Sequence, residues 1–347
     1  MKKFVRAHNG VALGLVAALL LVLGMMGWRL VASSDAGWSK HAISKSVHYI
    51  RIPVKQSKVV YCATDVLNYT NAGVFVSTDG GKKFANVTGT LPERVVKGLA
   101  VHPSNTNSAF VALLNGGVYR TSNRGKTWVQ MNNGLTVRQT TAILMNELAP
   151  STLLLGIKGG KVYRSTNGAA TWTNVATVTG DVTALAADPK NKTVYYLGTS
   201  KRIVYKSTDS GTTWQQRIIG LTGAANNIIT AIVVDPITTT NVYLGMSANG
   251  VFASTDGGES WAQRKTGLKN LKINDLVLYR KIPSIIYAAT KGSGVFKSTT
   301  SAATWVQFDK LNLTDLSVLG LALDQVTGKH LFAGGALGIY DYQLTAP

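Results

Sequence analysis

The chain has few of the residues that build metal, thiol or disulfide sites. Its 347 residues include one cysteine, Cys62, and five histidines. A single thiol excludes an intramolecular disulfide, and scattered histidines give no support for a structural zinc site or a cysteine protease. We therefore expect no metal and no cofactor. Cys62 lies in the apolar stretch 59–63 and is predicted to be a small core residue.

Negative charge is also scarce, with 16 Asp and Glu residues against 36 Lys and Arg residues and a net charge of +20. Glycosidases need two carboxylates that converge on one bond, and no two acids here form a recognisable pair. We therefore assign no catalytic residue. The basic surplus favours an acidic protein or another anionic polymer as partner, although it is also consistent with a role in solubility alone. The lack of clustered aromatic and basic residues argues against nucleic acid.

A long, apolar and uncharged run lies near the N-terminus, at residues 11–28, and basic residues precede it. A helix of this length just crosses a bilayer, and the basic flank is expected to stay in the cytoplasm. The sequence thus predicts a cytoplasmic segment over 1–10, a transmembrane signal-anchor over 11–28 and a linker over 29–36. The remaining chain would lie outside the cytoplasm. Small residues in the linker leave open cleavage as a signal peptide, which would give a secreted protein.

Residues 37–347 repeat one short pattern, in which a turn residue precedes Val or Ile and then an aromatic. The seven copies begin at Gly73, Gly117, Lys161, Ile203, Gly250, Gly294 and Gly338, and successive copies are 42 to 47 residues apart. Short strands repeating with a period in the low forties are typical of propeller blades. We therefore predict an all-β fold, a single seven-bladed β-propeller over 37–347, preceded by the N-terminal helix.

The last blade needs a strand from elsewhere in the sequence. Each repeat divides into four strands, of which the innermost is apolar and the fourth begins at an aromatic residue, but the seventh repeat provides three strands. Trp38 precedes the first inner strand by about the distance found for the other fourth-strand aromatics. We predict that residues 37–43 form the outer strand of the last blade and leave no open sheet edge.

A stronger motif lies between strands three and four of six repeats. Its first copy, at 77–84, reads Ser-Thr-Asp-Gly-Gly-Lys-Lys-Phe. It resembles the Asp-box, or bacterial neuraminidase repeat, in which the Asp or Asn bonds its own turn, Gly allows positive φ and the aromatic anchors the turn. A structural role is predicted for Asp79, Asn123, Asn167, Asp209 and Asp256. The sixth copy has Thr300 and Ala302 instead of Asp and Gly, which predicts a looser turn.

Two kinds of glycoside hydrolase remain as the alternative function. Residues 49–53 resemble the sialidase motif Phe/Tyr-Arg-Ile-Pro, whose Arg binds the substrate carboxylate, and this motif would assign that role to Arg51. However, six of the eight prolines fall at the end of an inner strand, so the repeat itself explains Pro53. Xyloglucanase-type enzymes also contain Asp-box propellers, but they place two of them face to face, and this sequence has one.

In a four-stranded antiparallel blade, the loops between strands two and three share one face with the crossovers to the next blade. We call this the crossover face. It is predicted to be basic, but the opposite face is basic too, so charge alone leaves open which face binds. The long loop 64–72 and the long crossover 221–227 favour the crossover face. The candidate binding residues are Tyr69, Arg94, Arg138, Lys158, Lys201, Arg202, Lys269 and Lys291.

Taken together, residues 37–347 resemble the single-propeller Asp-box family typified by photosystem II assembly factors of the Ycf48/HCF136 type. The resemblance rests on repeats of the form Gly-Val-Tyr-Lys/Arg-Ser-x-Asp-x-Gly-x-x-Trp, on the seven-fold count and on the predicted export. Sortilin-like receptor propellers contain the same repeat. The resemblance implies a monomeric, non-enzymatic scaffold. We therefore predict an extracytoplasmic, membrane-anchored binding propeller for a protein or an anionic glycan.

Overall fold

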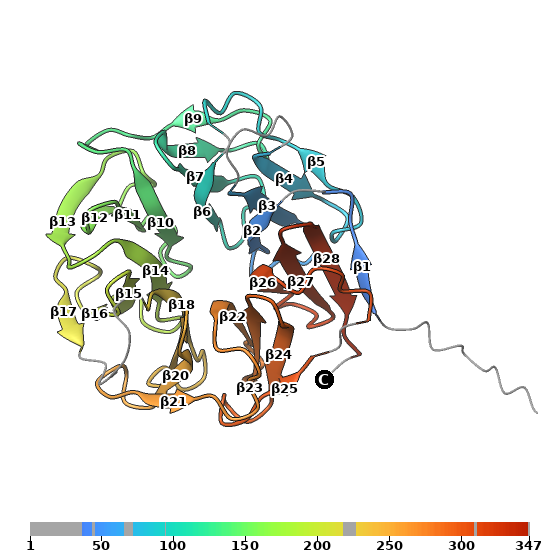
Figure 1. The fold of residues 1–347 in the computed structure, drawn as a ribbon. Helices are drawn as coiled ribbons and strands as arrows, with labels where there is room; N and C mark the ends of the chain where they lie inside the picture. The colour runs from blue at the N-terminus through green and yellow to red at the C-terminus, as the bar shows by residue number, and fades with distance from the viewer. Residues whose placement is uncertain are drawn as a thin grey trace, which may run out of the picture. The chain divides into compact units, whose positions relative to one another are not determined.

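The computed structural model describes residues 37–345 apart from 44–45, 66–71, 94, 218–226 and 309–310. All regular elements within these residues are β-strands, numbered β1 to β28, and they form seven four-stranded antiparallel sheets (Figure 1). The helix predicted over 11–28 lies outside the described residues. No helix in the described part of the chain is long and apolar enough to cross a bilayer.

The seven inner strands form a closed ring around an axis (Figure 1). They are β2 (Val47–Arg51), β6 (Val96–Val101), β10 (Thr140–Met145), β14 (Val182–Ala187), β18 (Ile229–Val234), β22 (Ile273–Tyr279) and β26 (Val318–Leu323). Each contacts the next one along the chain, and β26 contacts β2, which completes the ring. The prediction of an all-β, seven-bladed propeller is confirmed.

Burial decreases from the second and third strands to the outer strand of each blade. The second strands are β3 (Val60–Thr64), β7 (Ala109–Leu113), β11 (Leu153–Ile157), β15 (Tyr195–Thr199), β19 (Val242–Met246), β23 (Ile282–Thr290) and β27 (His330–Gly335). The third strands are β4 (Val74–Ser77), β8 (Gly117–Thr121), β12 (Lys161–Ser165), β16 (Val204–Ser207), β20 (Gly250–Ser254), β24 (Gly294–Ser298) and β28 (Gly338–Gln343). Neighbouring blades cover both faces of these strands, so they are apolar along most of their length.

The outer strands are short and mostly polar. They are β5 (Ala85–Asn86), β9 (Val129–Gln130), β13 (Thr173–Thr177), β17 (Gln215–Arg217), β21 (Ala262–Arg264), β25 (Val306–Gln307) and β1 (Trp38–Lys40). The last sheet takes its outer strand from the start of the domain, because β1 pairs with β28 and places Trp38 opposite Tyr342. The sequence predicts residues 37–43 at this edge, and the strand found there covers Trp38–Lys40. Trp38 is 2% exposed and makes edge-on ring contacts with Tyr342 and Phe308.

The six Asp-box turns share one set of hydrogen bonds. In the first, the Ser77 hydroxyl accepts from the Gly81 amide at 2.8 Å and the Asp79 carboxylate accepts from the Lys83 amide at 2.9 Å. In the fifth, bonds from Ser260 and Ser254 lower the pKa of Asp256. The sixth turn keeps the pattern, since the Ser298 hydroxyl accepts from the Ala302 amide and the Thr300 hydroxyl accepts from the Thr304 amide. The expectation of a looser sixth turn holds for one bond only: the hydroxyls of Ser298 and Thr300 lie 3.3 Å apart, against 2.8 Å between the Ser77 hydroxyl and the Asp79 carboxylate.

The Asp-box turns also fix the second face of the propeller. The amide of Gly80 donates to the carbonyl of Lys58, and the amide of Gly257 donates to the carbonyl of Thr240. Both acceptors belong to loops between the first and second strands of the same blade. We call the face made by these loops and turns the Asp-box face.

A histidine–carboxylate pair in the last blade predicts a pH-dependent contribution to stability. The His330 Nδ1 lies 3.1 Å from both carboxylate oxygens of Asp341, and this hydrogen bond raises the pKa of His330. Because the pKa of His330 is raised in the folded state, its pairing with Asp341 stabilises the fold fully below the ordinary histidine pKa of about 6.5. This contribution is lost as the pH rises through the folded-state pKa of His330. Asp341→Asn should therefore lower the free energy of unfolding more at acidic than at alkaline pH, by a difference of about 1 kcal/mol or less.

Urea denaturation of the wild-type protein and Asp341→Asn on both sides of neutrality would measure this difference. The matched control is the same pair of measurements in a His330→Gln background, where the pH-dependent part should disappear. An equal loss at both pH values, or a pH dependence that survives the His330→Gln background, would contradict the assignment.

Candidate axial channel and basic face

The inner strands enclose a channel of about 580 Å³ along the propeller axis. All seven inner strands have a register shift just after their first residue, and the residue left unpaired is a β-bulge. The bulged residues form a ring near the crossover face: His48, Lys97, Thr141, Thr183, Thr230, Asn274 and Leu319.

Several bulged residues connect one blade to the next. The side chains of Thr183, Thr230 and Asn274 each donate to the backbone carbonyl of the first residue in the following inner strand, at 2.6, 2.9 and 2.6 Å. Between the first two blades, the Lys97 ammonium donates to both carboxylate oxygens of Asp65 at 2.8 Å. Most polar groups of this ring therefore have structural partners, whereas the buried Thr141 hydroxyl has no hydrogen-bond partner among the described residues.

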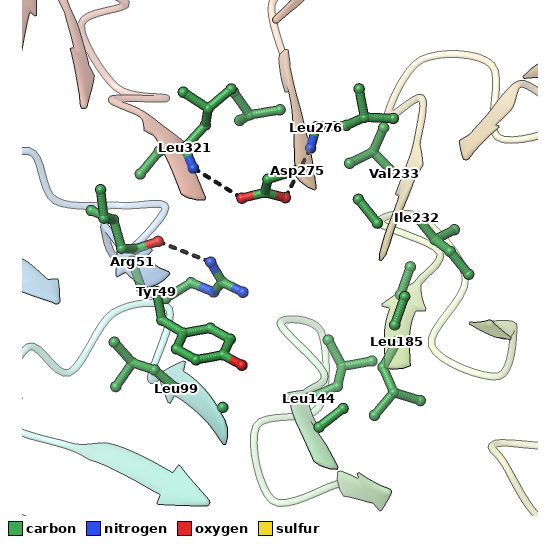
Figure 2. Close-up of a pocket in the computed structure, with 18 of the residues that line it drawn as sticks. Tyr49, Arg51, Leu99, Leu144, Leu185, Ile232, Val233, Asp275, Leu276 and Leu321 are labelled. Carbon is green, nitrogen blue, oxygen red and sulfur yellow. Dashed lines mark hydrogen bonds between the residues drawn. The ribbon is translucent and has the colours of Figure 1, made fainter. Parts of the chain in front are cut away.

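The middle of the channel combines an apolar wall with two opposite charges. Figure 2 shows the side chains of Arg51 and Asp275 facing the channel, with Leu144 and Leu185 across from them and Leu99 beside Tyr49. Arg51 is on β2 and Asp275 is on β22, so the two flank β26. Within the described residues no ion pair within 4 Å joins the two side chains. Burial raises the pKa of Asp275, and the positive charge of Arg51 acts in the opposite direction and lowers it.

Backbone groups hold both charged side chains in place. The Arg51 Nη1 donates to the carbonyl of Ile50 at 2.9 Å. The Asp275 carboxylate accepts from the amides of Leu276 at 2.8 Å and Leu321 at 2.9 Å (Figure 2). Tyr49 points into the same space, and burial raises its pKa.

One ion pair crosses the channel at its Asp-box end. The Arg280 Nη2, at the end of β22, lies 2.6 Å from the Glu147 Oε2, just beyond β10. These strands belong to the sixth and third blades, so the pair spans the opening. We call it the axial bridge. The two arginines among the described lining residues, Arg51 and Arg280, thus lie apart, and Glu147, the only glutamate among them, pairs with Arg280. A sialidase site would need several arginines that converge.

Exposed cations on the crossover face form two groups. The amide of Lys158 donates to the carbonyl of Gln139, which places Lys158 beside Arg138. The amide of Lys291 donates to the carbonyl of Lys272, and the Asn270 side chain donates to the carbonyl of Lys291, which brings Lys269 into the second group.

The structure does not bring all predicted binding residues together. Arg138, Lys158, Lys201, Lys269 and Lys291 are exposed, but they are spread over several blades. Arg202 is half-buried and has a positive φ of 63°. Tyr69 and Arg94 lie outside the described residues.

Acidic side chains on the same face are bonded to backbone amides or to a lysine, and they are half-buried or buried. The Asp181 carboxylate accepts from the Gly159 amide at 2.7 Å, and Glu93 accepts from the Asn115 amide at 2.8 Å. Asp315 is buried and accepts from the Leu337 amide, while Asp65 pairs with Lys97. The described part of the crossover face therefore exposes cations and no carboxylate. In contrast, the Asp-box face exposes Asp79, Asp209 and Asp256.

Among the described residues, no group of three or more His, Cys, Asp or Glu side chains is placed to hold a metal ion. Cys62 is fully buried, and burial raises the pKa of its thiol.

Comparison with known proteins supports the fold. A family model described as "Sortilin, neurotensin receptor 3" (Sortilin-Vps10) matches residues 72–158. No curated protein matches the sequence. The structure "YCF48 bound to D1 peptide" is 14% identical with a TM-score of 0.68, and the match covers 89% of this chain and 94% of that one.

Two further structures extend this comparison. YCF48 from Cyanidioschyzon merolae is 16% identical with a TM-score of 0.63, over 89% of this chain and 98% of that one. The GH74 xyloglucanase from Xanthomonas campestris is 15% identical with a TM-score of 0.71, over 89% of this chain and 54% of the enzyme. This chain thus spans about half the length of that enzyme. At these identities the likeness shows the fold: the chain is similar to the seven-bladed propellers of YCF48 and of the GH74 hydrolases.

Proposed function

We propose that this protein is a non-enzymatic binding propeller that recognises an acidic segment of another protein on its crossover face. The observation that carries the proposal is the unequal exposure of charge on that face, where cations are exposed and the described carboxylates are half-buried or buried and bonded to backbone amides or to Lys97. Such a surface attracts anionic partners and orients them as they approach. We further propose that residues 11–28 hold the propeller at a membrane, with the propeller outside the cytoplasm.

A polypeptide partner is favoured over a glycan by one comparison. The similar YCF48 propeller has been solved with a bound peptide, and the match covers most of both chains. The two cationic groups, one around Lys158 and one around Lys291, lie on different blades and could contact an extended acidic segment at two points.

Glycoside hydrolysis remains the alternative because GH74 enzymes share the fold. Two carboxylates of the channel are already engaged: Glu147 in the axial bridge and Asp275 in two amide bonds. A GH74-like role would therefore require carboxylates other than these two.

Charge reversal on each face tests the proposal. The crossover variant combines Arg138→Glu, Lys158→Glu and Lys269→Glu. The matched control on the Asp-box face combines Lys83→Glu, Lys126→Glu and Lys192→Glu, which changes net charge equally. Full-length tagged protein would be isolated from membranes of its own host in steps of increasing salt. At roughly 0.5–1 kcal/mol per exposed cation, the crossover variant should retain at least tenfold less partner protein than the control.

The remaining outcomes separate the alternatives. Equal partner retention by the two triple variants would overturn the proposed face. Recovery of an anionic polysaccharide instead of a protein would favour the glycan partner. Release of chromophore from chromogenic glycosides by the purified wild-type protein would favour the hydrolase.

A further inference from the structure

The axial channel has a charge arrangement that the crossover-face proposal does not use. Arg51 and Asp275 carry opposite charges, face the same cavity and stay apart (Figure 2). Each keeps hydrogen-bonding capacity. A guanidinium has five N–H donors, of which one here is bonded to Ile50, and a carboxylate accepts about four bonds, of which Asp275 uses two.

The surrounding channel offers few competing polar partners. Leu144 and Leu185 are half-buried and form the facing wall, whereas Leu99 is 1% exposed and packs in the core. At the crossover end the bulged residues Thr183, Thr230 and Asn274 are bonded to backbone carbonyls. At the other end the axial bridge lies across the opening. A ligand that enters from the crossover face would therefore meet Arg51 and Asp275, with Tyr49 beside them, as the polar groups of mid-channel.

Two unlike charges that line one channel can both be paired by a molecule that supplies both counter-charges. The volume of about 580 Å³ lies within the range of small-molecule sites and exceeds what one amino acid fills. The leucine wall favours an apolar body over a polar one. These requirements are met together by a zwitterion with an aliphatic side chain.

We propose that the axial channel binds a free aliphatic amino acid or a short aliphatic peptide, with its carboxylate on Arg51, its ammonium group on Asp275 and its side chains against the leucine wall. This site is separate from the cationic groups of the crossover face, so a bound zwitterion and a bound protein partner would occupy different surfaces.

Isothermal titration of the full-length protein with four probes tests the site. L-leucine and L-leucyl-L-leucine carry both charges, leucinamide lacks the carboxylate, and 4-methylpentanoate lacks the ammonium group. At least one zwitterion should bind tenfold or more tightly than either single-charge probe. Preference for leucine would identify a free amino acid, and preference for the dipeptide would identify a peptide.

Two charge-removing variants make the assignment specific. In Arg51→Gln, leucine should bind no better than leucinamide, because the carboxylate partner is gone. In Asp275→Asn, leucine should bind no better than 4-methylpentanoate. Damage to the fold would weaken all probes alike and would not produce this crossed pattern. Lys158→Gln, on the crossover face, is the matched control and should leave all four affinities unchanged.

Either of two results would overturn the proposal. One is the absence of zwitterion binding to the wild-type protein up to about 10 mM. The other is discrimination among the probes that survives both variants. The channel site and the cationic groups of the crossover face use different residues. Failure of the channel site would therefore leave the proposal of protein binding at the crossover face standing.

Discussion

Gly267→Ala should be among the most destabilising single substitutions in the propeller, lowering the free energy of unfolding by about 4 kcal/mol or more. Gly267 lies in the crossover to the sixth blade with φ at +87°, and a Cβ there would stand 1.9 Å from the Trp305 carbonyl oxygen. That oxygen belongs to backbone, and the adjacent Trp305 amide is bonded to the carbonyl of Thr266. The crossover and the outer strand cannot separate without breaking this bond.

Gly159→Ala is the control that separates conformation from collision. Gly159 has φ at +84°, almost the same as Gly267, but a Cβ there meets nothing within 4 Å. The left-handed conformation alone should cost about 1–2 kcal/mol. Guanidinium denaturation of both variants and the wild-type protein would give the two values. Equal losses would mean that the close approach of the two backbones contributes nothing.

Trp38→Ala should lower the free energy of unfolding by about 3–5 kcal/mol. The side chain is almost fully buried and packs edge-on against Phe308 and Tyr342, where it joins the first strand to the last blade. Its removal leaves a cavity at the one place where the ring is closed by strands from both ends of the domain. Loss of this anchor should also let β1 detach before the rest of the fold opens.

The equivalent aromatic of the fourth blade is the control. Trp214 is half-buried, and its indole nitrogen donates within its own turn, to the Gly211 carbonyl at 3.2 Å. Trp214→Ala should cost roughly half as much as Trp38→Ala, because less apolar surface is buried. Denaturation midpoints and limited proteolysis would compare the two variants. A smaller loss for Trp38→Ala than for Trp214→Ala would show that ring closure does not depend on this side chain.

The features that repeat were the ones predictable from sequence. Each blade meets the same packing requirement, so spacing and the aromatic after each Asp-box turn were enough to predict seven blades. The sixth turn shows the limit of consensus reasoning, because Thr300 gives its backbone the oxygen that the other turns take from Asp or Asn. The Asp-box turn therefore tolerates residues outside its consensus sequence when they provide an acceptor oxygen at this position.

The features of the channel and of the basic face depend on residues that meet only in the closed ring. Arg51 was visible in the sequence as part of a sialidase-like motif, but nothing nearby indicated Asp275 as its neighbour. The axial bridge joins two blades that are not adjacent, and no local sequence pattern predicts this ion pair. The choice of face needed the bonds of Asp181 and Asp315 to loop amides, which the sequence pattern does not reveal.

The pairing of Trp38 with Tyr342 also constrains how the protein is made. During synthesis β1 leaves the ribosome first, yet its partner β28 is among the last elements to appear. Contacts between such distant segments form slowly, and until they form the nascent sheets at both ends present unpaired edges. A chain interrupted anywhere before β28 cannot cover those edges. Ring closure therefore distinguishes finished molecules from unfinished ones, which gives proteases and chaperones a physical basis for quality control of this protein.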